Sequence, residues 1–162
     1  MLHHVSVGVT DVERAARFYD AVMEALGYRR IMQFLPSAVA YGLDAPSFWV
    51  QQPADGGPAT VGNGTHIGFT ARSKDAVDAF FAAAKEAGGL DNGPPGPRPD
   101  YGPEYYGAFV LDLDGNRLEA VLYPMGKAKP KAKKKVKARP ARKAGKSKSA
   151  PKRKPAKRSR RK

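Results

Sequence analysis

The sequence of 162 residues contains no cysteine. Disulfide bridges, thiolate metal ligands and a cysteine nucleophile are therefore excluded. Long apolar runs are missing as well: no stretch approaches the roughly 18 apolar residues of a membrane-spanning helix. The N-terminus also lacks the charged and apolar segments of a secretion signal. These absences predict a soluble, cytoplasmic protein with no transmembrane segment.

Acidic residues are absent from residues 127–162, which hold 20 Lys and Arg residues. Residues 1–126 therefore contain 9 basic and 15 acidic residues, so the overall net charge of +14 combines an acidic body with a basic tail. The tail has no aromatic residue, and Val136 is its only large aliphatic one. Such a composition cannot bury enough apolar surface to offset the entropy of ordering. We expect residues 127–162 to be disordered and residues 1–126 to form one domain.

The body contains an internal repeat. Residues 4–27 align without gaps on residues 66–89, and a repeat of this kind indicates one supersecondary unit used twice. The identical pairs are His4/His66, Phe18/Phe80, Ala21/Ala83, Glu24/Glu86, Ala25/Ala87 and Gly27/Gly89. In the later strands the alignment shifts to an offset of about 70, where Ala38 matches Ala108. This shift pairs Trp49 with Glu119.

Each copy shows the pattern of a βαβββ module, with modules at about 1–55 and 63–124. Alternating and helical apolar periodicities define the elements, and turn residues separate them. In the first copy we expect strands at 2–9, 29–34, 38–43 and 48–52 and a helix at 12–26. In the second copy we expect strands at 65–71, 105–112 and 117–123, a helix from Ser73 to Ala87, and an irregular loop at 91–103. The predicted fold class is α+β, with a concave, mostly antiparallel sheet cup.

Three side chains form a candidate metal site. His4 and His66 lie on the strand face opposite the apolar one, so both are expected on the concave face of the sheet. Glu119 lies within an otherwise apolar strand, where an isolated carboxylate is costly to bury. Two imidazoles and a carboxylate are a ligand set for divalent iron, manganese, zinc, nickel or cobalt. His3 is expected on the helix-packed side and outside this site.

A loop rich in proline and glycine precedes the last hairpin and carries further candidates. Its Arg98 is suited to bind a carboxylate or phosphate through two parallel hydrogen bonds. The phenols of Tyr101, Tyr105 and Tyr106 are suited to stacking or hydrogen bonding, although by alternation only one of the last two faces the cup. The alternative is that the tyrosines merely cover the sheet. Trp49 is expected to form a wall of the pocket.

The sequence resembles the vicinal oxygen chelate superfamily, which holds glyoxalase I, extradiol dioxygenases, and fosfomycin- and bleomycin-resistance proteins. The resemblance covers residues 1 to about 124 and rests on three segments: HHVSVGVTDVERAARFYDAVMEALGY, GNGTHIGFTARSKDAVDAFFAAA and YYGAFVLDLDGNRLEAV. It implies that His4, His66 and Glu119 are metal ligands, that Glu119 is also catalytic, and that the protein is a homodimer.

The resemblance also indicates how this chain departs from its relatives. Members with four protein ligands often have Glu, His or Gln where this chain has Trp49, which implies a three-ligand site. Gln51, on the same strand face, is a substitute ligand or a substrate contact. A further His and Tyr near the metal are usual in dioxygenases, and only His3 is spare here. The implied activity is a metal-dependent lyase, isomerase or transferase acting on a small oxygen-chelating molecule.

The basic tail resembles the C-terminal domain of linker histones. Its charge favours binding to a polyanion through counterion release, which does not depend on sequence. Non-specific nucleic acid is the expected partner of residues 127–162, with possible residence at the nucleoid, and a solubilising tail is the alternative. Two alternatives to an enzyme also stand: a ligand-binding module of the bleomycin-resistance type, or a nucleoid-associated protein that uses the domain for dimerisation.

Overall fold

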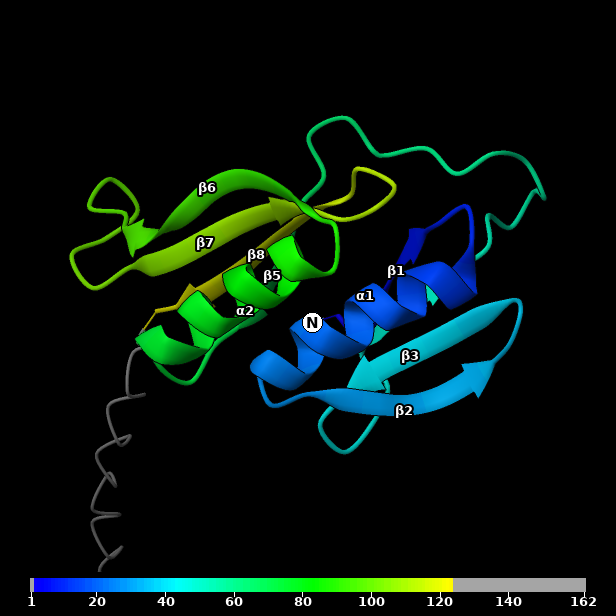
Figure 1. Cartoon of the computed structure of the whole chain (residues 1–162), viewed down its shortest axis with the longest axis horizontal. Coiled ribbons are helices and arrows are strands. Elements are labelled where there is room, and N and C mark those ends of the chain that lie inside the picture. Colours follow the sequence, from blue (N-terminus) through cyan, green and yellow to red (C-terminus); the bar gives the residue numbers. More distant parts are fainter. Residues whose placement is uncertain (1, 124–162) are drawn as a thin grey trace, which may run out of the picture. The chain divides into compact units, whose positions relative to one another are not determined.

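The computed structural model describes residues 2–123, so the expected tail at 127–162 lies outside the described residues. Both halves of the described region follow the order β-α-β-β-β, as the repeat predicts (Figure 1). The elements of module 1 are β1 Val5–Gly8, α1 Val12–Ala25, β2 Arg29–Phe34, β3 Ala38–Gly42 and β4 Phe48–Gln51. The elements of module 2 are β5 Ile67–Thr70, α2 Lys74–Glu86, β6 Leu90–Pro97, β7 Tyr106–Leu111 and β8 Arg117–Leu122.

Local side chains explain where the two helices begin and end. The Asp11 carboxylate accepts a hydrogen bond from the backbone N–H of Arg14 at 2.9 Å, and this bond caps α1. The Ser73 hydroxyl accepts one from Ala76 at 3.1 Å and caps α2 in the same way. Side chains of this type satisfy backbone donors that have no partner within the helix. Gly27, with φ of 79°, follows α1, since a left-handed backbone favours glycine there.

The strands form two separate four-stranded sheets, one in each module. The strand orders are β1-β4-β3-β2 and β5-β8-β7-β6, with one parallel pair and two antiparallel pairs in each sheet. Ser6 pairs with Trp49 in the first sheet, and Gly68 pairs with Glu119 in the second. These registers agree with the sequence alignment, because Ser6 and Gly68 are 62 positions apart and Trp49 and Glu119 are 70 apart.

Two sequence-based expectations are wrong in detail. The segment expected as an irregular loop from residue 91 contains β6, which pairs with β7 through two register shifts. Proline cannot donate to a sheet ladder and is tolerated at an edge, and β6 is an edge strand, so its prolines conceal it in the sequence. His3 is exposed and contacts His4, whereas it was expected against the helix-packed side.

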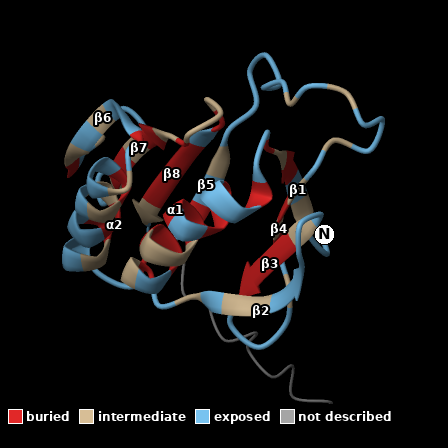
Figure 2. Cartoon of the chain, turned by 45° about the vertical axis from the view of Figure 1, so that its right-hand side comes forward, coloured by how far each residue is buried: buried red, intermediate tan, exposed pale blue. Residues whose placement is uncertain are grey.

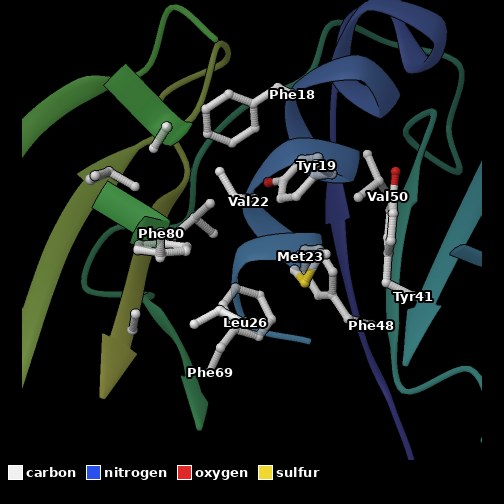
Figure 3. Packing of buried hydrophobic residues seen from close by; sticks show 14 of the residues in the cluster. Phe18, Tyr19, Val22, Met23, Leu26, Tyr41, Phe48, Val50, Phe69 and Phe80 are labelled. Atoms are coloured by element: carbon white, nitrogen blue, oxygen red, sulfur yellow. The ribbon is translucent and has the colours of Figure 1, made fainter. Parts of the chain in front are cut away.

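The core lies around α1 and continues from one module into the other. Figure 3 shows Phe18, Val22 and Leu26 on the side of α1 that faces module 2, with Tyr19 and Met23 facing the first sheet. The rings of Phe48 and Phe69, from different modules, meet at 5.0 Å between centroids. The helices α1 and α2 lie side by side, and β3, β7 and β8 carry most of the buried strand residues (Figure 2). Among the described residues, no helix has the length and apolarity needed to cross a membrane.

Candidate functional site

The sheet of module 2 has one face covered by α2 and one face that α2 does not cover. Leu118 and Ala120 are buried in the core, so Glu119 between them points to the other side of the sheet. We call this side the module 2 cup face. Its residues share two rows across the sheet: Gly68, Glu119, Phe109 and Gly93 in one, and Thr70, Val121, Gly107 and Gly96 in the next.

Glu119 is the centre of this face. Its side chain is only 4 % exposed, and both of its carboxylate oxygens are engaged. Oε2 lies 3.2 Å from Nε2 of His66, and Oε1 accepts a short hydrogen bond from the hydroxyl of Tyr105. Glu119 is therefore a buried carboxylate held by two side-chain partners on this face.

Two glycines make room for this arrangement. A Cβ at Gly107 would lie 3.2 Å from Oε1 of Glu119 and 3.3 Å from Cε1 of Tyr105. A Cβ at Gly68 would lie 3.5 Å from Oε2 of the same carboxylate. Burial, followed by the hydrogen bond to Glu119, raises the pKa of Tyr105. The Tyr105 phenol therefore remains protonated at neutral pH and acts as a hydrogen-bond donor.

The residues of this group have the right chemistry for a metal ion. His66 supplies an imidazole nitrogen and Glu119 a carboxylate oxygen within contact distance of one another, which is a ligand pair found in many divalent metal sites. The imidazole remains 54 % exposed, so it is accessible from solvent. Within residues 2–123, however, no group of three or more His, Cys, Asp or Glu side chains comes together.

His4, the third expected ligand, lies in a different environment. It immediately precedes β1 as His66 precedes β5, and it is exposed. Its Nδ1 is 2.8 Å from Nδ1 of His3, and its ring meets the edge of Trp49 at 6.5 Å between centroids. The structure thus brings together His66, Glu119 and Tyr105, and places His4 beside Trp49.

Trp49 belongs to an aromatic surface on the corresponding face of module 1. Its ring stacks on Phe34 at 6.3 Å with an interplanar angle of 12°. Phe34 is 54 % exposed and the neighbouring Met32 is 40 % exposed, so this surface is open to solvent in the single chain. Gln51 lies two residues from Trp49 on the same strand face and is half-buried.

The three remaining candidates divide between the two sides of sheet 2. The ring of Tyr101 meets that of Tyr105 at 5.3 Å, and the guanidinium of Arg98 lies 5.5 Å from the ring centre of Phe109 on the cup face. Tyr106 points the other way: its hydroxyl donates to Asp78 of α2 at 2.9 Å. Sequence reasoning missed Phe109, Phe34 and the two glycines beside Glu119. Phe109 pairs directly with Glu119 across the β7–β8 hairpin, so the two side chains share one face of the sheet.

Comparison with known proteins gives a consistent picture. Residues 1–120 match the family model described as the Glyoxalase/Bleomycin resistance protein/Dioxygenase superfamily. A solved structure of a glyoxalase/bleomycin resistance protein from Albidiferax ferrireducens T118 is 40% identical, with a TM-score of 0.69, over 76% of this chain and 99% of that one. A search of the curated proteins gave no match.

More distant structures share the fold. A lactoylglutathione lyase from Agrobacterium tumefaciens is 18% identical, with a TM-score of 0.53, over 75% of this chain and 92% of that one. The fosfomycin resistance protein FosX from Listeria monocytogenes is also 18% identical, with a TM-score of 0.57, over 77% of this chain and 94% of that one. Since the family model spans most of the chain and agrees with its two-module fold, the protein belongs to the glyoxalase/bleomycin resistance protein/dioxygenase superfamily.

Proposed function

We propose that the protein is a divalent-metal-dependent enzyme of the glyoxalase-like type, a lyase, isomerase or transferase that acts on a small molecule with two adjacent oxygen atoms. The observation that carries this proposal is the contact between His66 and Glu119 on the module 2 cup face. A buried carboxylate and an exposed imidazole at 3.2 Å supply two protein ligands of the expected set. The imidazole of His66 is accessible from solvent, so a substrate can reach it.

The third ligand is His4 of a second copy of the chain. Within one chain, His4 lies with Trp49 in module 1, apart from the ladder that carries Glu119. The edge strands β1 and β5 each pair on one side only within the described region, and no ladder joins them. A symmetric dimer that placed β1 of one chain beside β5 of another would bring the aromatic surface around Trp49 next to His66 and Glu119. Proteins of this family often form dimers.

The residues of such a composite site have separate roles. A bound metal ion would supply Lewis acidity toward substrate oxygens. The Tyr105 phenol donates a hydrogen bond, and with substrate bound it is placed to donate to a substrate oxygen in place of Glu119 Oε1. Glu119 would hold the ion, and it is also the carboxylate available as a general base. Trp49 and Phe34 exclude water from the apolar side of the substrate, with Gln51 and Tyr101 at the margins.

Metal content is the direct test of this proposal. The full chain loaded with Mn²⁺, Co²⁺, Ni²⁺, Zn²⁺ or Fe²⁺ in turn and then desalted is expected to retain about one ion per chain for at least one of these metals. His66→Ala and Glu119→Gln are expected to lose the ion, and so is His4→Ala. Glu24→Gln is the control for Glu119→Gln, because it removes an exposed carboxylate of α1 and is expected to leave retention unchanged. No retained metal in the unmodified protein would refute the proposal.

A second function is supported by the separation of charge along the chain. All 20 cationic residues of residues 127–162 follow a body of net charge −6. We propose that this segment binds nucleic acid non-specifically, with log affinity falling by about 0.9 for each phosphate contact per tenfold rise in salt. The test compares the full chain with a chain ending at residue 126 on one DNA duplex at several salt concentrations. Equal affinities would show that the segment does not bind DNA.

A further inference from the structure

Arg98 is fixed in place on the module 2 cup face by backbone contacts. It follows β6, and its Nη2 donates to the carbonyl oxygen of Pro94 at 2.7 Å while Nη1 donates to that of Pro97 at 3.2 Å. The guanidinium also lies over the ring of Phe109 at 5.5 Å from its centre. An arginine anchored in this way loses little further side-chain entropy when it binds a ligand.

Two glycines of β6 create the space that the guanidinium occupies. A Cβ at Gly96 would lie 3.1 Å from Nη1, and a Cβ at Gly93 would lie 3.5 Å from Nη2. Gly93 also has φ of 144°, a backbone conformation that other residues rarely adopt. The strand is therefore shaped so that the Arg98 side chain lies flat against the sheet.

Arg98 forms no ion pair with another residue of the described chain. The ion pairs found within residues 2–123 are Arg14–Asp114, Arg30–Asp20 and His66–Glu119, and Arg98 is in none of them. Arg98 is half-buried, whereas an arginine without a structural role usually extends into solvent. The N–H groups that do not reach Pro94 or Pro97 remain available as donors with a full positive charge.

The register of the sheet sets the separation between Arg98 and Glu119. Glu119 of β8 pairs with Phe109 of β7, which pairs with Gly93 of β6, so one row of the sheet joins the two groups. Adjacent strands lie about 4.8 Å apart, so the guanidinium above β6 and β7 is up to about 10 Å from Glu119. The aromatic ring of Phe109 lies between them on this row.

We infer that the substrate carries an oxyanion, a carboxylate or a phosphate, that Arg98 binds at one end while the other end reaches Glu119 and His66. The assignment of the second end rests on the function proposed above. The assignment of an oxyanion to the first end rests on the position and charge of Arg98.

The test uses metal-free full-length protein and two simple oxyanions, phenylphosphonate and benzoate, in isothermal titration calorimetry. Arg98→Gln is expected to weaken binding of the preferred anion at least tenfold. Arg29→Gln is the matched control, since Arg29 is also anchored on a backbone carbonyl, that of Leu43, but lies in module 1. The control is expected to bind within twofold of the unmodified chain. Preference for phenylphosphonate would indicate a phosphate substrate, and preference for benzoate a carboxylate.

A second variant keeps the charge and disturbs only the position of the guanidinium. Gly96→Ala is expected to weaken binding severalfold, because the new methyl group would displace Nη1. Equal affinities for Arg98→Gln and Arg29→Gln, or the absence of anion binding by the unmodified chain, would overturn the inference. Metal retention by Arg98→Gln, measured in parallel, is expected to be unchanged. Anion binding that depends on Arg98 in a chain that retains no metal would refute the proposed function and leave the oxyanion site in place.

Discussion

The hydroxyl of Tyr19 donates a 2.6 Å hydrogen bond to Oδ2 of Asp112, across 93 positions of sequence and from one module to the other. Oδ1 of the same carboxylate accepts from the backbone N–H groups of Asp114 and Asn116, and Asn116 in turn donates to the carbonyl oxygen of Gly8 at 3.2 Å. The turn from Asp112 to Asn116 therefore does more than close a hairpin. It ties β8, which carries Glu119, to module 1.

Loss of the Tyr19 hydroxyl is expected to destabilise the domain. Tyr19→Phe leaves the buried Asp112 carboxylate with one partner fewer, and hydrogen bonds to charged groups contribute about 1.5–3 kcal/mol. Urea unfolding monitored by circular dichroism measures the effect. Tyr28→Phe is the control, because its hydroxyl donates to the carbonyl oxygen of Thr70 at an exposed position, and it is expected to cost less than about 1 kcal/mol. Similar losses of unfolding free energy for both variants would contradict a stabilising role for the Tyr19–Asp112 hydrogen bond.

Stability is also expected to fall in alkaline solution. Burial raises the pKa of Tyr19 well above 10, and burial raises that of Tyr41 as well. Above pH 10 the unfolded chain releases phenol protons that the folded chain keeps, so the free energy of unfolding decreases as pH rises. Each such group contributes a slope of up to about 1.4 kcal/mol per pH unit. Tyr19→Phe should flatten the curve between pH 10 and 11.5, and the exposed Tyr123→Phe should not. If the free energy of unfolding of Tyr19→Phe and of the unmodified chain fell with pH at the same rate, Tyr19 would not cause the alkaline loss of stability.

Gly107→Ala tests whether the space around the carboxylate matters for the site. The added methyl group would lie 3.2 Å from Oε1 of Glu119, so the carboxylate or Tyr105 must move. We expect metal affinity to fall roughly tenfold, as for other changes to residues that support a ligand. Gly8→Ala is matched to it, since that strand glycine would meet Pro53 only at an ordinary 3.7 Å. Equal metal affinities in titrations of both variants would argue against a site at Glu119.

Trp49 offers a direct signal for the composite site, because it is the only tryptophan of the chain. If His4 and Trp49 of one chain face His66 and Glu119 of another, bound Co²⁺ or Cu²⁺ should quench the Trp49 emission. Glu119→Gln, which leaves Trp49 and its neighbours in place, should abolish the quenching. Quenching that persists in Glu119→Gln would place the metal elsewhere.

The elements of the fold follow closely from the sequence where local chemistry defines them. Asp11 and Ser73 cap the two expected helices, and β2 has the predicted bounds. β6 could not be predicted, because its prolines and glycines are typical of a loop and only pairing with β7 makes it a strand. The Tyr19–Asp112 contact was equally hidden, since no local pattern links residues 93 positions apart.

Part of the candidate site could also be predicted from the sequence. The match of His4 with His66 and the carboxylate within an apolar strand identified His66 and Glu119, and the structure places these two side chains in contact. The repeat could not show that His4 would lie with Trp49, because equivalent positions in two modules meet only if the modules face one another. The packing of α1 between the modules decides this arrangement, and it depends on tertiary contacts such as that of Phe48 with Phe69.

Subunit mixing tests whether the metal site joins two chains. His4→Ala and His66→Ala are each expected to retain no metal alone. Mixed and allowed to exchange subunits, they should recover about a quarter of the wild-type metal capacity, because about half of the dimers are mixed and each of these holds one intact site. If the mixture retains no more metal than the separate variants while exchange is shown to be complete, the site is not shared between chains.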